Sequence, residues 1–88
     1  FTIEFGSSAP RQSDNKVQLT IILHITGGAK PFKVLEDNIQ QTITATTDGV
    51  QYVRDWHNCG PDEPHTVTVV SADGQQSSQR TMMPYKCS

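Results

Sequence analysis

The stretch KVQLTIILHIT, residues 16–26, decides the fold class of this chain. Apolar residues occupy every second position of the stretch, and mostly polar residues lie between them. Because successive side chains of a β-strand point to opposite faces, this alternation predicts one long strand with a buried face. Ile22 breaks the polar face, so we expect it to lie under a loop or against a neighbouring domain. The residues predicted to face the core are Val17, Leu19, Ile21, Leu23 and Ile25.

Six further runs are rich in Val, Ile, Thr and aromatic residues, and short clusters of Gly, Pro, Asp, Asn and Ser separate them. No run shows the sustained 3.6-residue apolar period of an amphipathic helix. Seven short strands in 88 residues predict an all-β fold, a seven-stranded antiparallel Greek-key β-sandwich of the immunoglobulin-like class. We expect a single domain over residues 1–88. The six further runs cover residues 2–5, 31–35, 39–46, 50–56, 66–71 and 75–83.

Two Asp-Gly pairs, Asp48-Gly49 and Asp73-Gly74, lie between predicted strands. A type I′ turn needs positive φ at both central residues, and Asp-Gly commonly meets that need. We therefore predict a hairpin at each pair. Gly27-Gly28 is expected to form another reversal with positive φ, after which Phe32 enters the core.

The aromatic residues allow two interpretations. Tyr52 and Trp56 share one face of the run 50–56, which in a sandwich usually packs into the core, so Trp56 is predicted to be buried. The alternative is that Tyr52, Trp56 and Tyr85 form an aromatic platform that binds a sugar.

Cys59 and Cys87 form an even pair without the CxxC spacing of a redox or zinc motif. They lie at the outer ends of two consecutive predicted strands, which antiparallel pairing would bring together. We predict a disulfide between them, and with it an oxidising compartment, meaning a secreted or cell-surface protein or a periplasmic one. The alternative is two free, buried thiols in a cytosolic protein.

The sequence from Leu23 to Val34, LHITGGAKPFKV, and the closing HTVTVVSADG of residues 65–74 carry a resemblance to a known group. The chain resembles the immunoglobulin-like and fibronectin-type-III-like repeats of large bacterial surface and adhesin proteins. The resemblance implies a sandwich fold and names no ligand. Such modules often carry Cys directly after the closing Asp-Gly, whereas here Gln75 follows it.

The charge argues against two kinds of partner. The formal net charge is −2, and the seven Lys and Arg residues are scattered singly, so no basic stripe could follow a row of phosphates. We therefore expect no nucleic acid, and no membrane insertion, because no apolar run approaches the ~20 residues that a span needs. The chain starts without Met or a signal peptide, so we expect an excised domain or a processed fragment.

No metal or other cofactor is expected. A zinc site would need four converging ligands, and we expect His24, His57 and His65 to be surface or loop residues, although His57 and Cys59 form a His-x-Cys pair. The acidic clusters Glu36-Asp37-Asn38 and Asp62-Glu63 could supply oxygens to Ca²⁺ at a domain junction, but we expect solvated turns.

Catalysis is not expected either. Asp55, His57 and the serines have the residue types of a hydrolytic triad but lack a nucleophile elbow. We expect a non-catalytic structural or adhesive module of a secreted or cell-surface protein, which spaces or presents neighbouring domains. The first alternative is a carbohydrate- or protein-binding accessory module of a secreted enzyme. The second is a free-standing small secreted protein, such as an inhibitor or an allergen-like factor.

Overall fold

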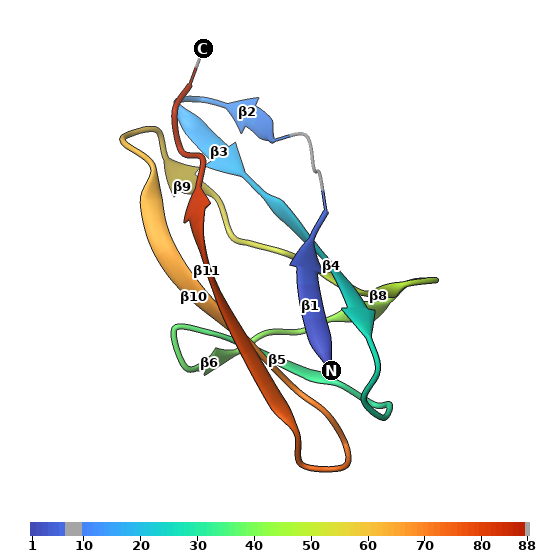
Figure 1. Cartoon of the computed structure of the whole chain (residues 1–88). Helices are drawn as coiled ribbons and strands as arrows, with labels where there is room; N and C mark the ends of the chain where they lie inside the picture. The colour runs from blue at the N-terminus through green and yellow to red at the C-terminus, as the bar shows by residue number, and fades with distance from the viewer. Residues whose placement is uncertain (7–9, 88) are drawn as a thin grey trace.

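The computed structural model describes residues 1–6 and 10–87, and Figure 1 shows them as an elongated set of β-strands. Within these residues no helix is long and apolar enough to cross a membrane. The strands are β1 (Thr2–Phe5), β2 (Arg11–Ser13), β3 (Lys16–Gln18), β4 (Thr20–Thr26), β5 (Lys33–Glu36), β6 (Ile39–Gln40), β7 (Thr44–Ala45), β8 (Gly49–Val53), β9 (His57–Asn58), β10 (Glu63–Val70) and β11 (Gln76–Met83).

Two four-stranded sheets share one core, which confirms the all-β, sandwich-like architecture. Their strand orders are β1-β4-β8-β7 and β11-β10-β5-β6, and every pairing is antiparallel. A small third sheet, β2-β3-β9, is also antiparallel. Residues of both large sheets meet in a single apolar cluster, including Leu23 and Tyr52 from one sheet and Val34, Val67 and Val69 from the other.

The alternation of residues 16–26 is confirmed, with one difference. Four of its five inward residues are buried and Ile25 is partly buried against the core. The run divides at Leu19, because β3 pairs with β2 and β9 whereas β4 pairs with β1 and β8. Ile22 lies against Gly6, which follows β1 directly: the Gly6 amide donates to the Ile22 carbonyl at 2.8 Å, and a Cβ at Gly6 would lie 3.0 Å from Cγ2 of Ile22.

Both Asp-Gly hairpins exist, but the predicted type I′ geometry is wrong for both. Neither Asp48 nor Gly49 has positive φ, and in the second pair only Gly74 does, at 93°. Position 49 requires glycine for a steric reason and not for its φ, because a Cβ there would lie 2.1 Å from the Leu23 carbonyl oxygen. Two other hairpin turns do have positive φ at both central residues. Asp14-Asn15 (51° and 62°) joins β2 to β3, and Asp37-Asn38 (50° and 70°) joins β5 to β6. Gly27-Gly28 has positive φ as predicted (85° and 74°).

Two predicted strands were drawn too long. The run 39–46 divides into β6 and β7, which belong to different sheets, and Ile39 is 67% exposed. The run 50–56 ends at Val53, so the period of two is lost before Trp56, which is 41% exposed rather than buried. Tyr85 is fully buried instead.

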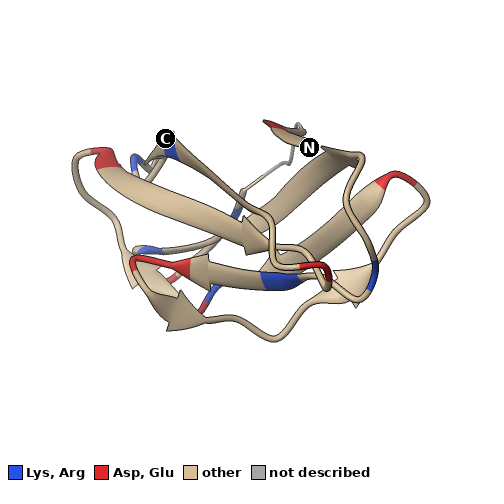
Figure 2. Ribbon diagram, turned by 60° about the horizontal axis from the view of Figure 1, so that its bottom comes forward, with Lys and Arg blue, Asp and Glu red and all other residues tan. Residues whose placement is uncertain are grey.

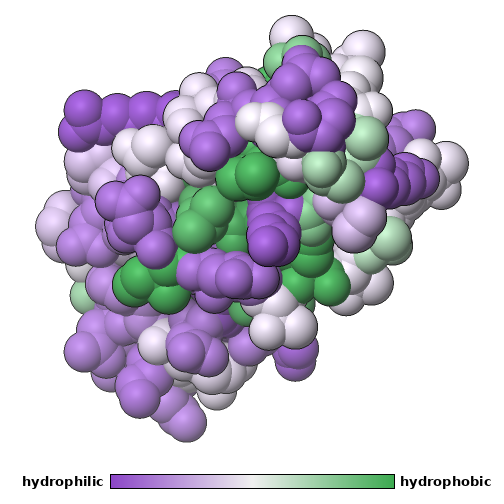
Figure 3. All heavy atoms as spheres, turned by 90° about the horizontal axis from the view of Figure 1, so that it is seen from below, coloured by the Kyte–Doolittle hydropathy of each residue, from purple (hydrophilic) through white to green (hydrophobic). Residues whose placement is uncertain are grey.

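The two ends of the chain lie far apart on the sandwich. The N-terminus is in the lower part of Figure 1 and the C-terminus is at the upper tip of a body measuring 42 × 22 × 18 Å. Apolar atoms gather among hydrophilic ones on the lower end, which Figure 3 views. There the β4–β5 connection helps to line an apolar pocket of about 300 Å³, with Pro31, Phe32, Ile43 and Val50 in its wall.

At the upper end the predicted disulfide joins Cys59 to Cys87, with their Cα atoms 5.5 Å apart. It ties the C-terminal segment to the connection between β9 and β10. Figure 2 shows the Lys, Arg, Asp and Glu residues scattered along the ribbon.

Candidate functional site

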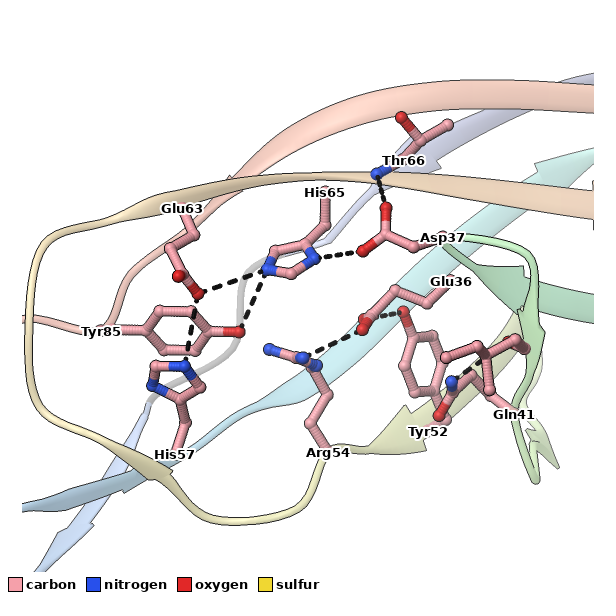
Figure 4. Close-up of polar contacts among 11 residues, drawn as sticks. Glu36, Asp37, Gln41, Tyr52, Arg54, His57, Glu63, His65, Thr66 and Tyr85 are labelled. Atoms are coloured by element: carbon pink, nitrogen blue, oxygen red, sulfur yellow. Dashed lines mark hydrogen bonds and ion pairs between the residues drawn. The ribbon is translucent and has the colours of Figure 1, made fainter.

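A network of polar side chains connects β5, the β8–β9 segment, β10 and the C-terminal segment (Figure 4). These segments are distant in sequence. Antiparallel pairing joins β5 to β10, and the Cys59–Cys87 disulfide joins the C-terminal segment to the β9–β10 connection. The network has two halves, one centred on Glu36 and the other on Tyr85.

The first half is a buried carboxylate with two partners. Glu36 is 7% exposed, because it occupies an inward position at the end of β5. An Arg54 guanidinium nitrogen lies 3.0 Å from its Oε2, and the Tyr52 hydroxyl donates to its Oε1 at 3.0 Å. Burial, and then the neighbouring Glu36 carboxylate, raise the pKa of Tyr52, so its hydroxyl stays protonated as a donor. Both oxygens of Glu36 are therefore engaged.

Asp37 ties the β5–β6 turn to β10. Its Oδ1 accepts from the Thr66 amide at 3.0 Å, and its Oδ2 is hydrogen-bonded to Nδ1 of His65. The Thr66 amide, followed by His65, lowers the pKa of the Asp37 carboxyl below its usual 3.8, because both hydrogen bonds favour the charged form. This carboxylate fixes the ring orientation of His65.

The second half places two imidazoles around one carboxylate. Glu63 Oε2 lies 3.3 Å from His57 Nε2 and 3.7 Å from His65 Nε2. The His57 ring stacks on the ring of Tyr85, with centroids 3.7 Å apart and planes 8° apart. His65 meets the same ring edge-on at 6.2 Å. The Arg54 guanidinium carbon is 5.4 Å from the Tyr85 centroid, within the range of a cation–π contact.

A backbone hydrogen bond and the nearby disulfide hold Tyr85 in place. Its carbonyl accepts from the Gly60 amide at 2.9 Å, and the disulfide closes two residues further on at Cys87. The disulfide therefore helps to fix the aromatic ring against which both histidines are arranged.

Beside this network lies a groove of about 370 Å³ with exposed apolar residues on its wall. Ile39 and Trp56, 67% and 41% exposed, line it together with the polar side chains of Gln40, Gln41 and Asp55. Large exposed apolar residues next to polar groups are typical of surfaces that contact a ligand or another protein.

The structure brings together only some of the residues that the sequence singled out. His57 and His65 meet at Glu63, whereas His24 is exposed on β4 and lies 3.9 Å from Asp48. Cys59 is bonded to Cys87, which rules out the His-x-Cys zinc pair. The alternative of an aromatic platform made by Tyr52, Trp56 and Tyr85 does not hold, because Tyr52 and Tyr85 are buried and of the three only Trp56 is exposed.

The acidic clusters considered for Ca²⁺ are largely occupied by the protein itself. One ligand atom each of Glu36, Asp37 and His65 lies within 4.8 Å of the others. Glu36 is already bound by Arg54 and Tyr52, and Asp37 by Thr66 and His65. A cation at this triad would also face the Arg54 guanidinium, so the triad is better explained as a structural network. Asp62, from the second cluster, has one buried oxygen without a hydrogen-bond partner.

Sequence reasoning missed Glu36, Arg54, Glu63 and Tyr85 as members of one site. One signal was present: a charged residue, Glu36, follows Val34 at the inward spacing of a strand. No family model, curated protein or solved structure matches this chain.

Proposed function

We propose that this chain is a non-catalytic structural or adhesive module of a secreted or cell-surface protein, which spaces or presents the domains next to it. The observation that carries the proposal is the position of the two ends, on opposite parts of a body 42 Å long (Figure 1). A chain that enters through the lower part of the sandwich and leaves near its upper tip holds its neighbours apart.

The strand order supports an immunoglobulin-like, Greek-key assignment. The constant-type immunoglobulin sandwich has one sheet in the order ABED and another containing CFG. The orders β1-β4-β8-β7 and β11-β10-β5 correspond to these two sheets, with β6 added at one edge. The pattern LHITGGAKPFKV, with its glycine reversal at 85° and 74°, adds the resemblance to modules of bacterial surface proteins.

The disulfide and the apolar lower end fit the same role. A Cys59–Cys87 bond is stable in an oxidising compartment, which supports a secreted or surface location. The apolar pocket beside Phe32 lies near the N-terminal residue Phe1, whose ring centroid is 6.3 Å from that of Phe32. A preceding domain would reach this surface first.

Small-angle X-ray scattering of two copies joined head to tail tests the spacing role. We expect an extended particle with a maximum dimension near twice that of one copy, because the joined ends lie on opposite parts of each sandwich. A compact pair, folded back on itself, would contradict the proposal.

The groove favours a second candidate, a carbohydrate- or protein-binding accessory module. Trp56 and Ile39 expose apolar surface beside amide and carboxylate groups, which suits a sugar ring or a peptide. Titration with a panel of polysaccharide fragments and extracellular proteins tests this candidate, with Trp fluorescence as the readout. Saturable binding that is lost in Trp56→Ala and kept in Val53→Ala, which removes another exposed apolar residue, would favour it over the spacing role.

A further inference from the structure

Strand β11 forms a long open edge of its sheet (Figure 1). It pairs with β10 on one side, in one unbroken register over its eight residues, and no strand of the described residues pairs with its other side. The other edge strands of the two large sheets are shorter, since β1 has four residues and β6 and β7 have two each. An unpaired edge presents a row of free N–H and C=O groups to which another strand can bind.

Two backbone hydrogen bonds fix which groups of β11 point outwards. The Ser71 amide donates to the Gln75 carbonyl at 2.8 Å, so Gln75 faces the β10 side. The Asp37 amide donates to the Thr66 carbonyl at 2.9 Å, so Thr66 faces β5 rather than β11. Because backbone groups alternate along a strand, the odd-numbered residues of β11 bond to β10 and the even-numbered ones direct their N–H and C=O groups away from the sheet. The outward residues are Gln76, Ser78, Arg80 and Met82.

Little protects this edge. Sheets commonly blunt an edge with Pro, a bulge or charged side chains. The strand β11 has no Pro and no bulge, and Arg80 is its single charged residue. The space beside it is open, because Gln79 is exposed although its cross-strand partner Val67 is fully buried in the core. The edge is therefore accessible to an incoming strand.

A second copy of β11 satisfies all the outward groups in one antiparallel register. Two residues of an antiparallel pair that face each other through their backbones exchange both hydrogen bonds. When Gln79 lies opposite Gln79 of the second copy, Ser78 faces Arg80. Gln76 then faces Met82, and every outward N–H and C=O of both strands has a partner.

Other registers are worse. A shift of two residues one way places Arg80 opposite Arg80 of the second copy, where like charges repel. The opposite shift leaves Met82 facing Gly74, which lies in the β10–β11 turn with a φ of 93°. In the favoured register Ser77 lies opposite Thr81, a hydroxyl pair that stabilises neighbouring strands. A two-fold interface needs the same patch on both copies to be complementary to itself, and this edge meets that need.

We propose that two copies of this chain pair antiparallel through their β11 strands, about a two-fold axis at Gln79. The pairing joins the two β11-β10-β5-β6 sheets into one continuous sheet. Contacts along a single edge bury little surface, so the dimer forms reversibly and depends on concentration. The proposal goes beyond the spacing role and does not rest on it, because it joins molecules side by side rather than through the ends of the chain.

Sedimentation equilibrium of the oxidised chain from ~10 μM to ~1 mM tests the proposal. We expect the mass to rise from that of one chain towards that of two. Ser78→Pro removes an outward N–H and leaves the β10 ladder intact, so it should weaken dimerisation at least about tenfold. Ser78→Ala is the matched control, because it lacks the same hydroxyl but keeps the N–H, and it should dimerise like the wild type. Thermal unfolding of dilute samples shows that each variant folds.

Charges at position 79 test the register without altering the backbone. Gln79→Glu alone and Gln79→Lys alone each place like charges at the two-fold axis and should dimerise more weakly than the wild type. An equimolar mixture of the two variants pairs Glu with Lys and should associate more tightly than either variant alone. The Gln79 side chain is exposed, so both variants should fold whether or not Ser78→Pro does.

Amide hydrogen exchange gives a second readout. The amides of the even-numbered residues of β11 should exchange fast in dilute solution and become protected at ~1 mM, whereas the odd-numbered ones should be protected in both. A wild-type chain that stays monomeric at ~1 mM would overturn the proposal. So would a Ser78→Pro dimer as tight as that of Ser78→Ala, or a mixture of the Gln79 variants no tighter than either alone.

Discussion

The imidazole of His57 lies flat on the phenol ring of Tyr85, with ring centroids 3.7 Å apart and planes 8° from parallel. Tyr85 is fully buried and lies beyond the last strand, so a side chain of the C-terminal segment completes the upper end of the core. The same ring contacts His65 and Arg54, and it therefore joins the apolar core to the polar network.

Tyr85 should be the most sensitive single position at this end. Tyr85→Ala should lower the free energy of unfolding by about 3–5 kcal/mol, because it removes a fully buried aromatic ring. Tyr85→Phe keeps the ring stacked on His57 and removes only the 3.4 Å contact of its hydroxyl to His65, so it should cost less than about 1 kcal/mol. Urea unfolding followed by circular dichroism measures both, and equal losses would contradict the role of the ring.

The disulfide should supply a large share of the stability. It closes a loop with a sequence separation of 28, which corresponds to about 3–4 kcal/mol in the chain-entropy model. For a domain of this size that is a fall in melting temperature of roughly 15–25 °C on reduction. Cys59→Ser/Cys87→Ser should melt like the reduced wild type and be insensitive to reductant. An unchanged melt on reduction would show that the bond contributes nothing.

Gly49 and Gly60 form a matched pair of glycine positions. A Cβ at Gly49 would lie 2.1 Å from the Leu23 carbonyl oxygen, whereas a Cβ at Gly60 meets nothing within 4 Å. Gly49→Ala should therefore destabilise the chain by at least about 2 kcal/mol through the separation of β4 and β8. Gly60→Ala should be neutral or stabilising by up to about 1 kcal/mol, since φ is not positive there. If chemical denaturation shows that Gly60→Ala lowers the free energy of unfolding more than Gly49→Ala does, the close approach of β8 to β4 is wrong.

Tyr52 gives a pH dependence with a definite sign. Its folded pKa is raised above the unfolded value of 10.0, so the stability it contributes is complete below pH 10 and is lost as the pH rises further. Tyr52→Phe should have a flatter alkaline limb than the wild type when unfolding free energy is measured between pH 8 and pH 11. Parallel alkaline limbs would show that Tyr52 ionises freely in the folded state.

The sequence was sufficient for the all-β, sandwich-like architecture and for the bond between Cys59 and Cys87. Alternation over residues 16–26 is a local signal, and the backbone obeys it because a strand has a period of two. Trp56 shows the limit of this signal. A period of two that continued past Val53 would bury Trp56, but β8 ends at Val53 and Trp56 is exposed. The turn prediction was also wrong. Among the hairpin turns, positive φ at both central residues occurs at Asp14-Asn15 and Asp37-Asn38 rather than at Asp48-Gly49.

The candidate site could not be predicted because its members are brought together only by tertiary structure. Glu36, His57 and Tyr85 belong to segments that no local pattern relates. Each histidine alone is typical of a surface loop. Only the pairing of β10 with β5 places His65 beside Asp37, and only the disulfide-linked C-terminal segment places Tyr85 under His57.

Pulling on single molecules through their two ends most directly tests the proposed spacing role, in which the folded sandwich holds its neighbours apart and the disulfide closes its C-terminal end. We predict a distinct unfolding event whose length gain grows on reduction by about 100 Å, which is the sequence separation of 28 at roughly 3.5 Å per residue. Extension without a distinct unfolding event, or the same length gain with and without reductant, would contradict the account.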